Sequence, residues 1–228
     1  MFIQQDYADS LVKSGFVHRR NIDCCTCGPL VYIRNLKCAS TFFFSSFINC
    51  WKWDPIAWED IDWSRQHVFS HIMNPVERRH KGVAEFINQH GVNELFLNNT
   101  QFQNFIRYAP VFDEHTSSYH DTFGNLCYHI DWIPLTGRTH EQVIKLTEML
   151  LRYYGLKTLV NWDYNNVHRT HPEKKVIEQR LRELYNQDQQ QPEWISRYME
   201  NDVRLYQRIE QKFDDVAGNW PEISWLKV

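Results

Sequence analysis

Residues 35–47, NLKCASTFFFSSF, gather polar side chains directly before a run of aromatic ones. Lys37 contributes an ammonium group, and Ser40 and Thr41 contribute two hydroxyls. The apolar segment LVYIR before them has the composition and length of a strand, and the apolar spacing after them is typical of a buried helix. Exposed N–H groups and the dipole at the start of a helix both favour negative charge. The segment therefore predicts a pocket for an anion.

The P-loop of nucleotide-binding proteins is the first candidate for such a pocket. That motif reads G-x-x-x-x-G-K-[ST], with glycines before a lysine at the end of the loop. Here both glycines are missing, and Lys37 precedes the hydroxyl residues. The sequence also offers no convincing Mg²⁺-binding Asp after an apolar strand. A kinase of the P-loop type is therefore the least favoured of three hypotheses.

The order K-x-[AG]-[ST]-[ST] after a strand resembles instead the 5′-phosphosulfate loop of the sulfotransferases. A second stretch, HIMNPVERRHKGV at 71–83, resembles the family's strand that ends in R-[DN]-P-x-x-R-x-x-S-x-Y and binds the 3′-phosphate of the donor. Asn74, Pro75, Glu77 and Arg78 stand as they do in the carbohydrate sulfotransferases. Together the two stretches favour a sulfotransferase as the first hypothesis.

The second stretch departs from the family at two positions. The first Arg of the signature is Met73 here, and its Ser is Lys81. We expect Lys81 to supply the cation that Met73 cannot, helped by Arg78 or Arg79. The departure also favours a rival hypothesis from another class, a non-catalytic nucleotide-binding or interaction protein that kept the fold after losing proper 3′-phosphate recognition.

The resemblance implies an enzyme that transfers a sulfuryl group from 3′-phosphoadenosine 5′-phosphosulfate (PAPS) to a hydroxyl, most readily that of a carbohydrate acceptor. Lys37 would contact the 5′-phosphate and the departing oxygen, because a cation must hold the charge that develops there. Transfer of this type should not depend on a metal ion. The resemblance assigns donor binding to Lys37, Cys38, Ala39, Ser40, Thr41, Arg78 and Lys81.

Sulfuryl transfer also needs a base that takes the proton of the acceptor hydroxyl. His129 and Asp131 fall on one face of a strand predicted at 126–135, and paired groups can tune each other's proton affinity. HIDWIPL in this strand resembles a His-Trp-x-Pro-Gln element of some carbohydrate sulfotransferases. We favour this pair as catalytic residues, with structural hydrogen bonding as the alternative. The other candidates lie between the two signatures and are Glu59, Asp60 and His67.

Strand and helix patterns alternate along the chain. We expect strands at 29–34, 67–73, 126–135 and 156–162, and helices at 4–14, 40–50, 75–89, 139–155, 172–187 and 201–213. This alternation predicts a single α/β domain over residues 1–228, with a parallel β-sheet flanked by helices and a helical C-terminal part. Ligands bind such sheets at the carboxyl ends of the strands, where the loop after LVYIR would lie. The resemblance implies the P-loop-like fold of the sulfotransferases.

The composition limits the partners of the chain. A net charge of −3 and a pI near 6.4 argue against a general nucleic-acid-binding protein. Apolar runs are too short for a membrane span, and the N-terminus lacks the pattern of a signal peptide. We therefore expect a soluble cytoplasmic protein that binds a small nucleotide donor and no membrane. The sequence does not indicate an oligomeric state.

Cysteine and tryptophan are the remaining residue types that could form a site. Three of the six cysteines cluster in CCTCG at 24–28, but no second Cys or His pair follows at zinc-site spacing. We therefore expect reduced thiols rather than a metal site. Several of the nine tryptophans fall in WKWDPIAWEDIDW at 51–63. We expect them to pack in the core or to line an acceptor cleft.

Overall fold

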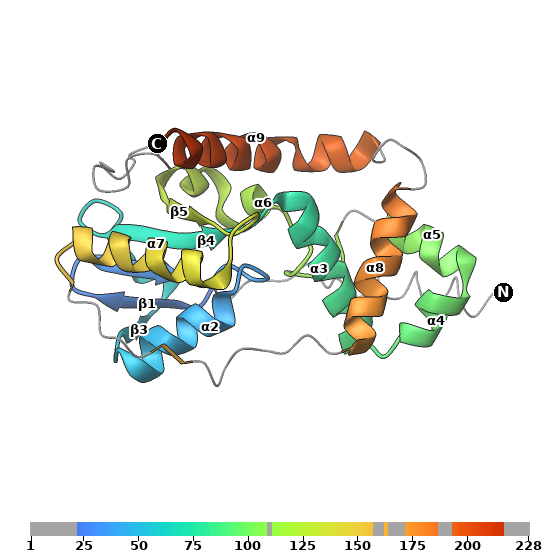
Figure 1. The fold of residues 1–228 in the computed structure, drawn as a ribbon, viewed down its shortest axis with the longest axis horizontal. Coiled ribbons are helices and arrows are strands. Elements are labelled where there is room, and N and C mark those ends of the chain that lie inside the picture. The colour runs from blue at the N-terminus through green and yellow to red at the C-terminus, as the bar shows by residue number, and fades with distance from the viewer. Residues whose placement is uncertain (1–21, 109–110, 157–161, 164–171, 187–192, 217–228) are drawn as a thin grey trace. The chain divides into compact units, whose positions relative to one another are not determined.

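The computed structural model describes residues 22–108, 111–156, 162–163, 172–186 and 193–216 (Figure 1). The helix predicted at 4–14 and most of the strand predicted at 156–162 lie outside these residues. The sequence predicted one domain. Contacts between residues divide the chain into two compact units. Of the described residues, 22–74, 123–156, 162–163 and 204–216 belong to the sheet unit, and 75–108, 111–122, 172–186 and 193–203 belong to the helical unit.

The sheet unit is built on five strands, which confirms an α/β fold. In spatial order they are β3 (Asp54–Ile56), β1 (Cys24–Cys27), β2 (Leu30–Ile33), β4 (His67–Ile72) and β5 (Asp131–Pro134). Strand β2 runs parallel to β4, and β4 runs parallel to β5. The carboxyl ends of these three strands therefore lie at one edge of the sheet.

The prediction of a wholly parallel sheet is wrong at the other side, because β1 runs antiparallel to both β2 and β3. Strands β1 and β2 are joined by the two residues Gly28 and Pro29, and Gly28 has a φ of +57°. So short a turn can connect only antiparallel neighbours, because a parallel pair needs a long crossover. The short connection thus fixes the direction of β1 and makes the sheet mixed.

Helices α2 (Ser40–Ser45) and α7 (His140–Tyr153) pack on the face of the sheet to which His71 points. The ring of Phe43 in α2 stacks on the His71 ring with centroids 3.7 Å apart, and Thr147 in α7 lies 3.0 Å from the His71 Nε2. Helix α7 begins with a capping box formed by Thr139 and Gln142, close to the predicted boundary. Figure 1 shows α7 running along the sheet.

The helix predicted at 40–50 changes its geometry halfway. Residues Ser46–Cys50 form a π-helix, η1, which ends where the Trp51 N–H reaches the Ser46 carbonyl at 3.1 Å. The Ser46 hydroxyl donates to the Phe42 carbonyl at 2.7 Å and accepts the Asp163 N–H at 3.0 Å. A side chain that bonds to the helical backbone in this way favours departure from regular α geometry.

Two further short elements precede β4 and β5. A 3₁₀-helix, η2 (Trp58–Asp60), follows β3, and a second one, η3 (Gly124–His129), precedes β5. The strand predicted at 126–135 is therefore wrong over its first half. The indole N–H of Trp132 donates to the Cys127 carbonyl at 2.8 Å, and this bond holds η3 against β5.

The helical unit contains α3 (Pro75–Gln89), α4 (Asn93–Asn98), α5 (Thr100–Tyr108), α6 (Tyr119–Phe123) and α8 (Pro172–Asn186). Helix α9 (Glu193–Val216) contributes its first part to this unit and its last part to the sheet unit. The helix predicted at 75–89 is confirmed, and it begins at a proline as expected. Within the described part of the chain, no helix is long and apolar enough to cross a membrane.

Candidate functional site

The loop between β2 and α2 is the candidate site, and its residue Asn35 ties it to the sheet. Asn35 is almost fully buried, and its side-chain amide donates to the His71 carbonyl at 2.8 Å and to the Cys38 Sγ at 3.3 Å. Since His71 lies near the end of β4, this amide fixes the loop across the carboxyl ends of two parallel strands. Ligands of α/β sheets bind at this edge.

The backbone of the loop takes an unusual path without any glycine. Lys37 and Ala39 have φ values of 63° and 52°, whereas the φ of Cys38 between them is negative. A left-handed conformation costs a non-glycine residue about 1 kcal/mol. Alternation of left- and right-handed residues turns successive N–H groups toward one side and forms a concave anion site, called a nest. Strain of this kind concentrates at functional sites.

The expected hydroxyls flank this nest. Ser40 is buried at the start of α2, and Thr41 is half-buried. The Thr41 Oγ1 accepts a hydrogen bond from the Arg34 Nη2 at 3.4 Å, so its own proton is left to donate elsewhere. Arg34 is a second cation beside Lys37, and its Nη1 contacts the Asp23 carboxylate at 2.5 Å. Sequence reasoning overlooked Arg34, although it is the last residue of LVYIR.

A neutral histidine supports the loop from the core. The Thr147 hydroxyl donates to the Val143 carbonyl at 2.9 Å, so it must accept a proton from the His71 Nε2. The His71 Nδ1 can then accept from the Tyr32 hydroxyl, 3.3 Å away. Complete burial lowers the pKa of His71 to about 3, which keeps the ring neutral.

The residues of the second signature have other partners. Met73 is buried in the sheet unit. Arg78 is buried in the helical unit, where its Nη1 donates to the Ser117 carbonyl at 2.5 Å and its guanidinium lies 4.7 Å from the centre of the Tyr119 ring. Lys81 forms an ion pair with Glu77 at 3.1 Å on the surface of α3. The structure thus brings residues 37–41 together but gives Arg78 and Lys81 separate structural contacts.

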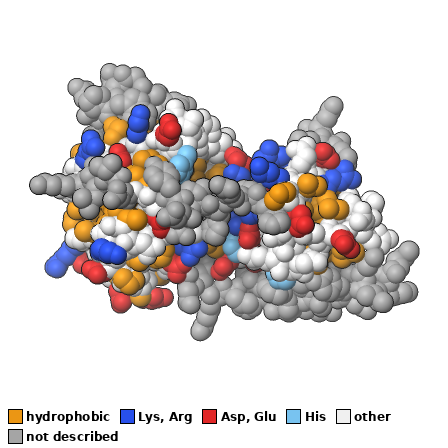
Figure 2. All heavy atoms as spheres, turned by 60° about the horizontal axis from the view of Figure 1, so that its bottom comes forward, with side chains coloured by type: hydrophobic (Ala, Val, Ile, Leu, Met, Phe, Trp, Pro, Cys, Tyr) orange, Lys and Arg blue, Asp and Glu red, His pale blue; other side chains and the backbone are white. Residues whose placement is uncertain are grey.

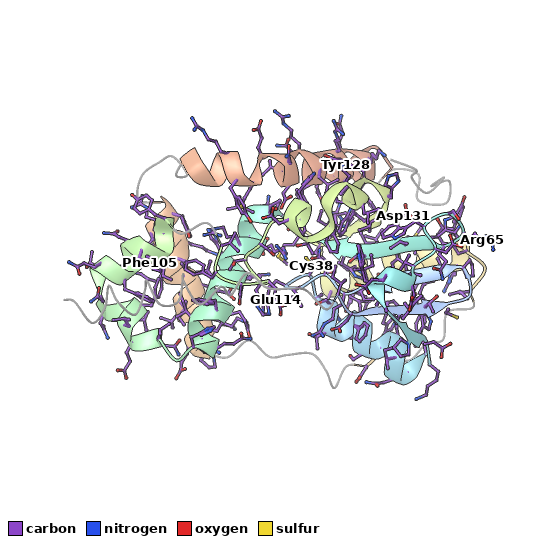
Figure 3. All side chains as sticks on the ribbon, turned by 180° about the vertical axis from the view of Figure 1, so that it is seen from behind. Cys38, Arg65, Phe105, Glu114, Tyr128 and Asp131 are labelled. Carbon is purple, nitrogen blue, oxygen red and sulfur yellow. The ribbon has the colours of Figure 1, made fainter. Side chains whose placement is uncertain are left out.

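The favoured catalytic pair does not share a strand face. His129 is exposed at the end of η3, and Asp131 is the first residue of β5, far from the carboxyl end that the loop occupies. Figure 3 shows Asp131 and Cys38 at separate places in the sheet unit. The expectation of one strand face is wrong because the chain before Asp131 closes into 3₁₀ turns.

Asp131 interacts with Tyr154, which in turn contacts His67. The Asp131 Oδ2 accepts the Tyr154 hydroxyl at 3.2 Å, and the Tyr154 ring lies 4.3 Å from that of His67. Burial raises the pKa of the Asp131 carboxyl to about 6, against a smaller lowering by the Tyr154 hydrogen bond. The other candidates for a base, Glu59 and Asp60, are exposed in η2.

The tryptophan-rich segment is partly core. Trp53 is buried and stacks on Phe47 with ring centroids 4.5 Å apart, whereas Trp58 and Trp63 form a half-buried pair at 5.4 Å. No disulfide joins cysteines in the described part of the chain. His, Cys, Asp and Glu side chains form no group of three suited to a metal ion in that same part. The face drawn in Figure 2 mixes hydrophobic side chains with charges of both signs.

Comparisons with protein-family models, with curated proteins and with solved structures find no match for this chain. The candidate site therefore has to be interpreted from its own geometry.

Proposed function

We propose that the chain is a sulfotransferase that holds the 5′-phosphosulfate of PAPS on the loop at 34–41 and transfers the sulfuryl group to a hydroxyl of a carbohydrate acceptor. The observation that carries the proposal is the left-handed backbone at Lys37 and Ala39. Two left-handed non-glycine residues in one loop are costly for folding alone, and binding of an anion in the nest would offset this cost.

The groups of the loop would make different contacts with the donor. The Cys38 N–H donates to the Asn35 carbonyl at 3.2 Å, so the neighbouring backbone N–H groups of the nest and the Ser40 and Thr41 hydroxyls would donate to the phosphosulfate oxygens. Lys37 places its ammonium at the bridging oxygen, where negative charge grows as the sulfuryl group departs. Arg34 adds positive charge and, by donating to Thr41, leaves the threonine proton for the anion.

Recognition of the 3′-phosphate is a separate part of the proposal. Lys81 belongs to the helical unit, where it is paired with Glu77, whereas the loop at 34–41 belongs to the sheet unit. Arg78 lies in the same helical unit and donates to the buried Ser117 carbonyl. These contacts, with Met73 in place of the signature arginine, favour the second candidate, a non-catalytic protein that binds nucleotides without reading the 3′-phosphate.

Calorimetric titration without metal tests both candidates. The wild-type chain is titrated with 3′-phosphoadenosine 5′-phosphate and with adenosine 5′-phosphate. A sulfotransferase should prefer the bisphosphate, and Lys81→Ala should abolish that preference. Equal affinity for the two nucleotides would support the non-catalytic candidate, and binding of neither would refute both.

Lys37→Ala tests the loop itself. Loss of one charge-assisted contact should weaken nucleotide binding by about 10- to 100-fold. Lys52→Ala is the matched control, because Lys52 is an exposed lysine that also has a positive φ, 57°, but lies outside the loop. Equal losses in the two variants would contradict the assignment. Binding that requires added Mg²⁺ would point to phosphoryl transfer instead.

A further inference from the structure

A carboxylate and three aromatic rings come together where β4 and β5 begin. The Asp131 Oδ2 accepts the Tyr154 hydroxyl at 3.2 Å, and the centre of the Tyr154 ring lies 4.3 Å from that of the His67 ring. The Tyr153 ring stands at 84° to the Tyr154 ring, with the two centres 5.1 Å apart. We call these four residues the Asp131 cluster. All four belong to the sheet unit, so the cluster lies within one compact unit.

The strand register and the end of one helix bring these side chains together. Asp131 is paired with Phe69 between the parallel strands β5 and β4, and His67 lies two residues before Phe69. Side chains of paired residues, and of residues two apart, point to the same face of a sheet. Helix α7 covers this face and ends at Tyr153, shortly before Gly155, whose φ is 80°. The two tyrosines at the helix end therefore meet the side chains at the strand starts.

Part of the cluster is accessible to solvent. The Tyr153 residue is 57% exposed, and His67 is exposed as well. Asp131 and Tyr154 are half-buried. A small ligand at the rings can therefore meet apolar ring surface and a carboxylate at the same time.

The Asp131 carboxylate lacks the basic partner that several other half-buried carboxylates have. Those ion pairs join Glu77 to Lys81, Glu85 to Lys174 and Glu210 to Arg138. The Lys212 ammonium lowers the pKa of the Asp131 carboxyl, but the two groups form no ion pair within the part of the chain that the structure describes. Burial has the larger effect and raises this pKa to about 6. An accessible charge that the fold leaves under-compensated is a candidate for a binding site.

We propose that the Asp131 cluster binds a small quaternary ammonium ion. The Asp131 carboxylate supplies the opposite charge, and the faces of the tyrosine rings attract a cation through their quadrupoles. The negative end of the α7 dipole lies at Tyr153 and adds to this attraction. A quaternary ammonium ion has no N–H group, so it suits a site that offers ring surface and few hydrogen-bond acceptors, whereas a primary ammonium has three donors to satisfy.

The inference is independent of the proposed function. Asp131 is the first residue of β5, whereas the loop at 34–41 lies at the opposite, carboxyl edge of the parallel strands. Figure 3 shows Asp131 apart from Cys38 of that loop. The cluster is thus a second site in the same unit.

Titration of the full chain with choline tests the site. Choline carries a trimethylammonium group, and its neutral isostere dimethylbutanol has carbon in place of the nitrogen. At about pH 8 the Asp131 carboxyl is ionised. We expect saturable binding of choline and at least about 10-fold weaker binding of the isostere, because loss of the charge removes the attraction to the carboxylate and to the rings.

Three variants locate the bound cation. Asp131→Asn should weaken choline binding by about 10-fold or more, and Tyr153→Leu should weaken it by about 3-fold. Tyr108→Leu is the matched control, because Tyr108 is 54% exposed but belongs to the helical unit, and this variant should bind choline like wild type. Urea denaturation of each variant checks that the fold is retained.

The outcomes decide the inference on its own terms. Wild-type chain that shows no saturable choline binding would overturn it, and so would equal affinities for choline and the isostere. Affinity that is unchanged in folded Asp131→Asn would place the cation elsewhere and would also overturn it. Equal losses in Tyr153→Leu and Tyr108→Leu would exclude the tyrosine rings as the specific contact. None of these results bears on nucleotide binding at the loop, so failure of this inference leaves the proposed function standing.

Discussion

Asp131→Asn should raise the stability of the protein at neutral pH. The Asp131 carboxyl is partly buried beside Tyr154, and burial raises its pKa to about 6. In an unfolded chain an aspartate has a pKa of about 4. The folded state therefore binds the proton more tightly than the unfolded state does, and ionisation of Asp131 opposes folding.

The sign and size of the effect follow from proton linkage. The stability due to protonated Asp131 is fully present below about pH 4 and is lost as the pH rises through about 6. Two pKa units correspond to about 3 kcal/mol, and the remaining solvent exposure of the carboxyl reduces this to about 2 kcal/mol. Asparagine cannot ionise, and its carbonyl oxygen still accepts the Tyr154 hydroxyl. Above about pH 7 the free energy of unfolding of Asp131→Asn should thus be about 2 kcal/mol larger than that of wild type.

Urea denaturation of both proteins at a series of pH values between about 4 and 8 measures this difference. The free-energy gap between Asp131→Asn and wild type should widen with pH and level off above about 7. Asp62→Asn is the control with the opposite sign, because hydrogen bonds from Ser64 lower the pKa of that exposed carboxyl. A gap for Asp131→Asn that stays constant across the pH range would refute the reasoning.

Three other substitutions test separate parts of the structure by denaturant unfolding. Ala39→Gly should stabilise the protein by about 0.5 kcal/mol, because relief of the left-handed strain exceeds the added entropy of the unfolded chain; a destabilised variant would contradict the assigned backbone. Gly82→Ala should destabilise by about 3 kcal/mol, because its Cβ meets the His115 carbonyl oxygen, and a neutral result would show that the chain at His115 does not pack on α3 there. Thr147→Val should cost about 1 to 3 kcal/mol by leaving the His71 Nε2 proton without an acceptor, whereas Thr122→Val, which loses a half-buried hydroxyl, should cost less.

The sequence was sufficient for those elements whose boundaries depend on local chemistry. The helix from Pro75 and the helix capped by Thr139 are where their start signals place them, and β2 and β4 coincide with apolar runs. Strand β1 escaped prediction because Cys24–Cys27 has neither alternation nor β-branched residues beyond Thr26. Its place in the sheet depends on pairing with β2, which no local pattern encodes.

The same division applies to the candidate site. Local order predicted that Lys37, Ser40 and Thr41 would gather at the end of a strand. The left-handed backbone at Lys37 and Ala39 was not predictable, because neither residue type favours that region.

The π-helix at Ser46–Cys50 sets the rotational phase of the chain beyond Cys50. A π turn accommodates one more residue than an α turn, so the residues after Cys50 are rotated by about 100° relative to a continuous α-helix. Removing one residue from this segment would restore α geometry and turn Trp53 away from its stack on Phe47. The segment therefore tolerates substitution at its exposed Asn49 far better than any change in its length.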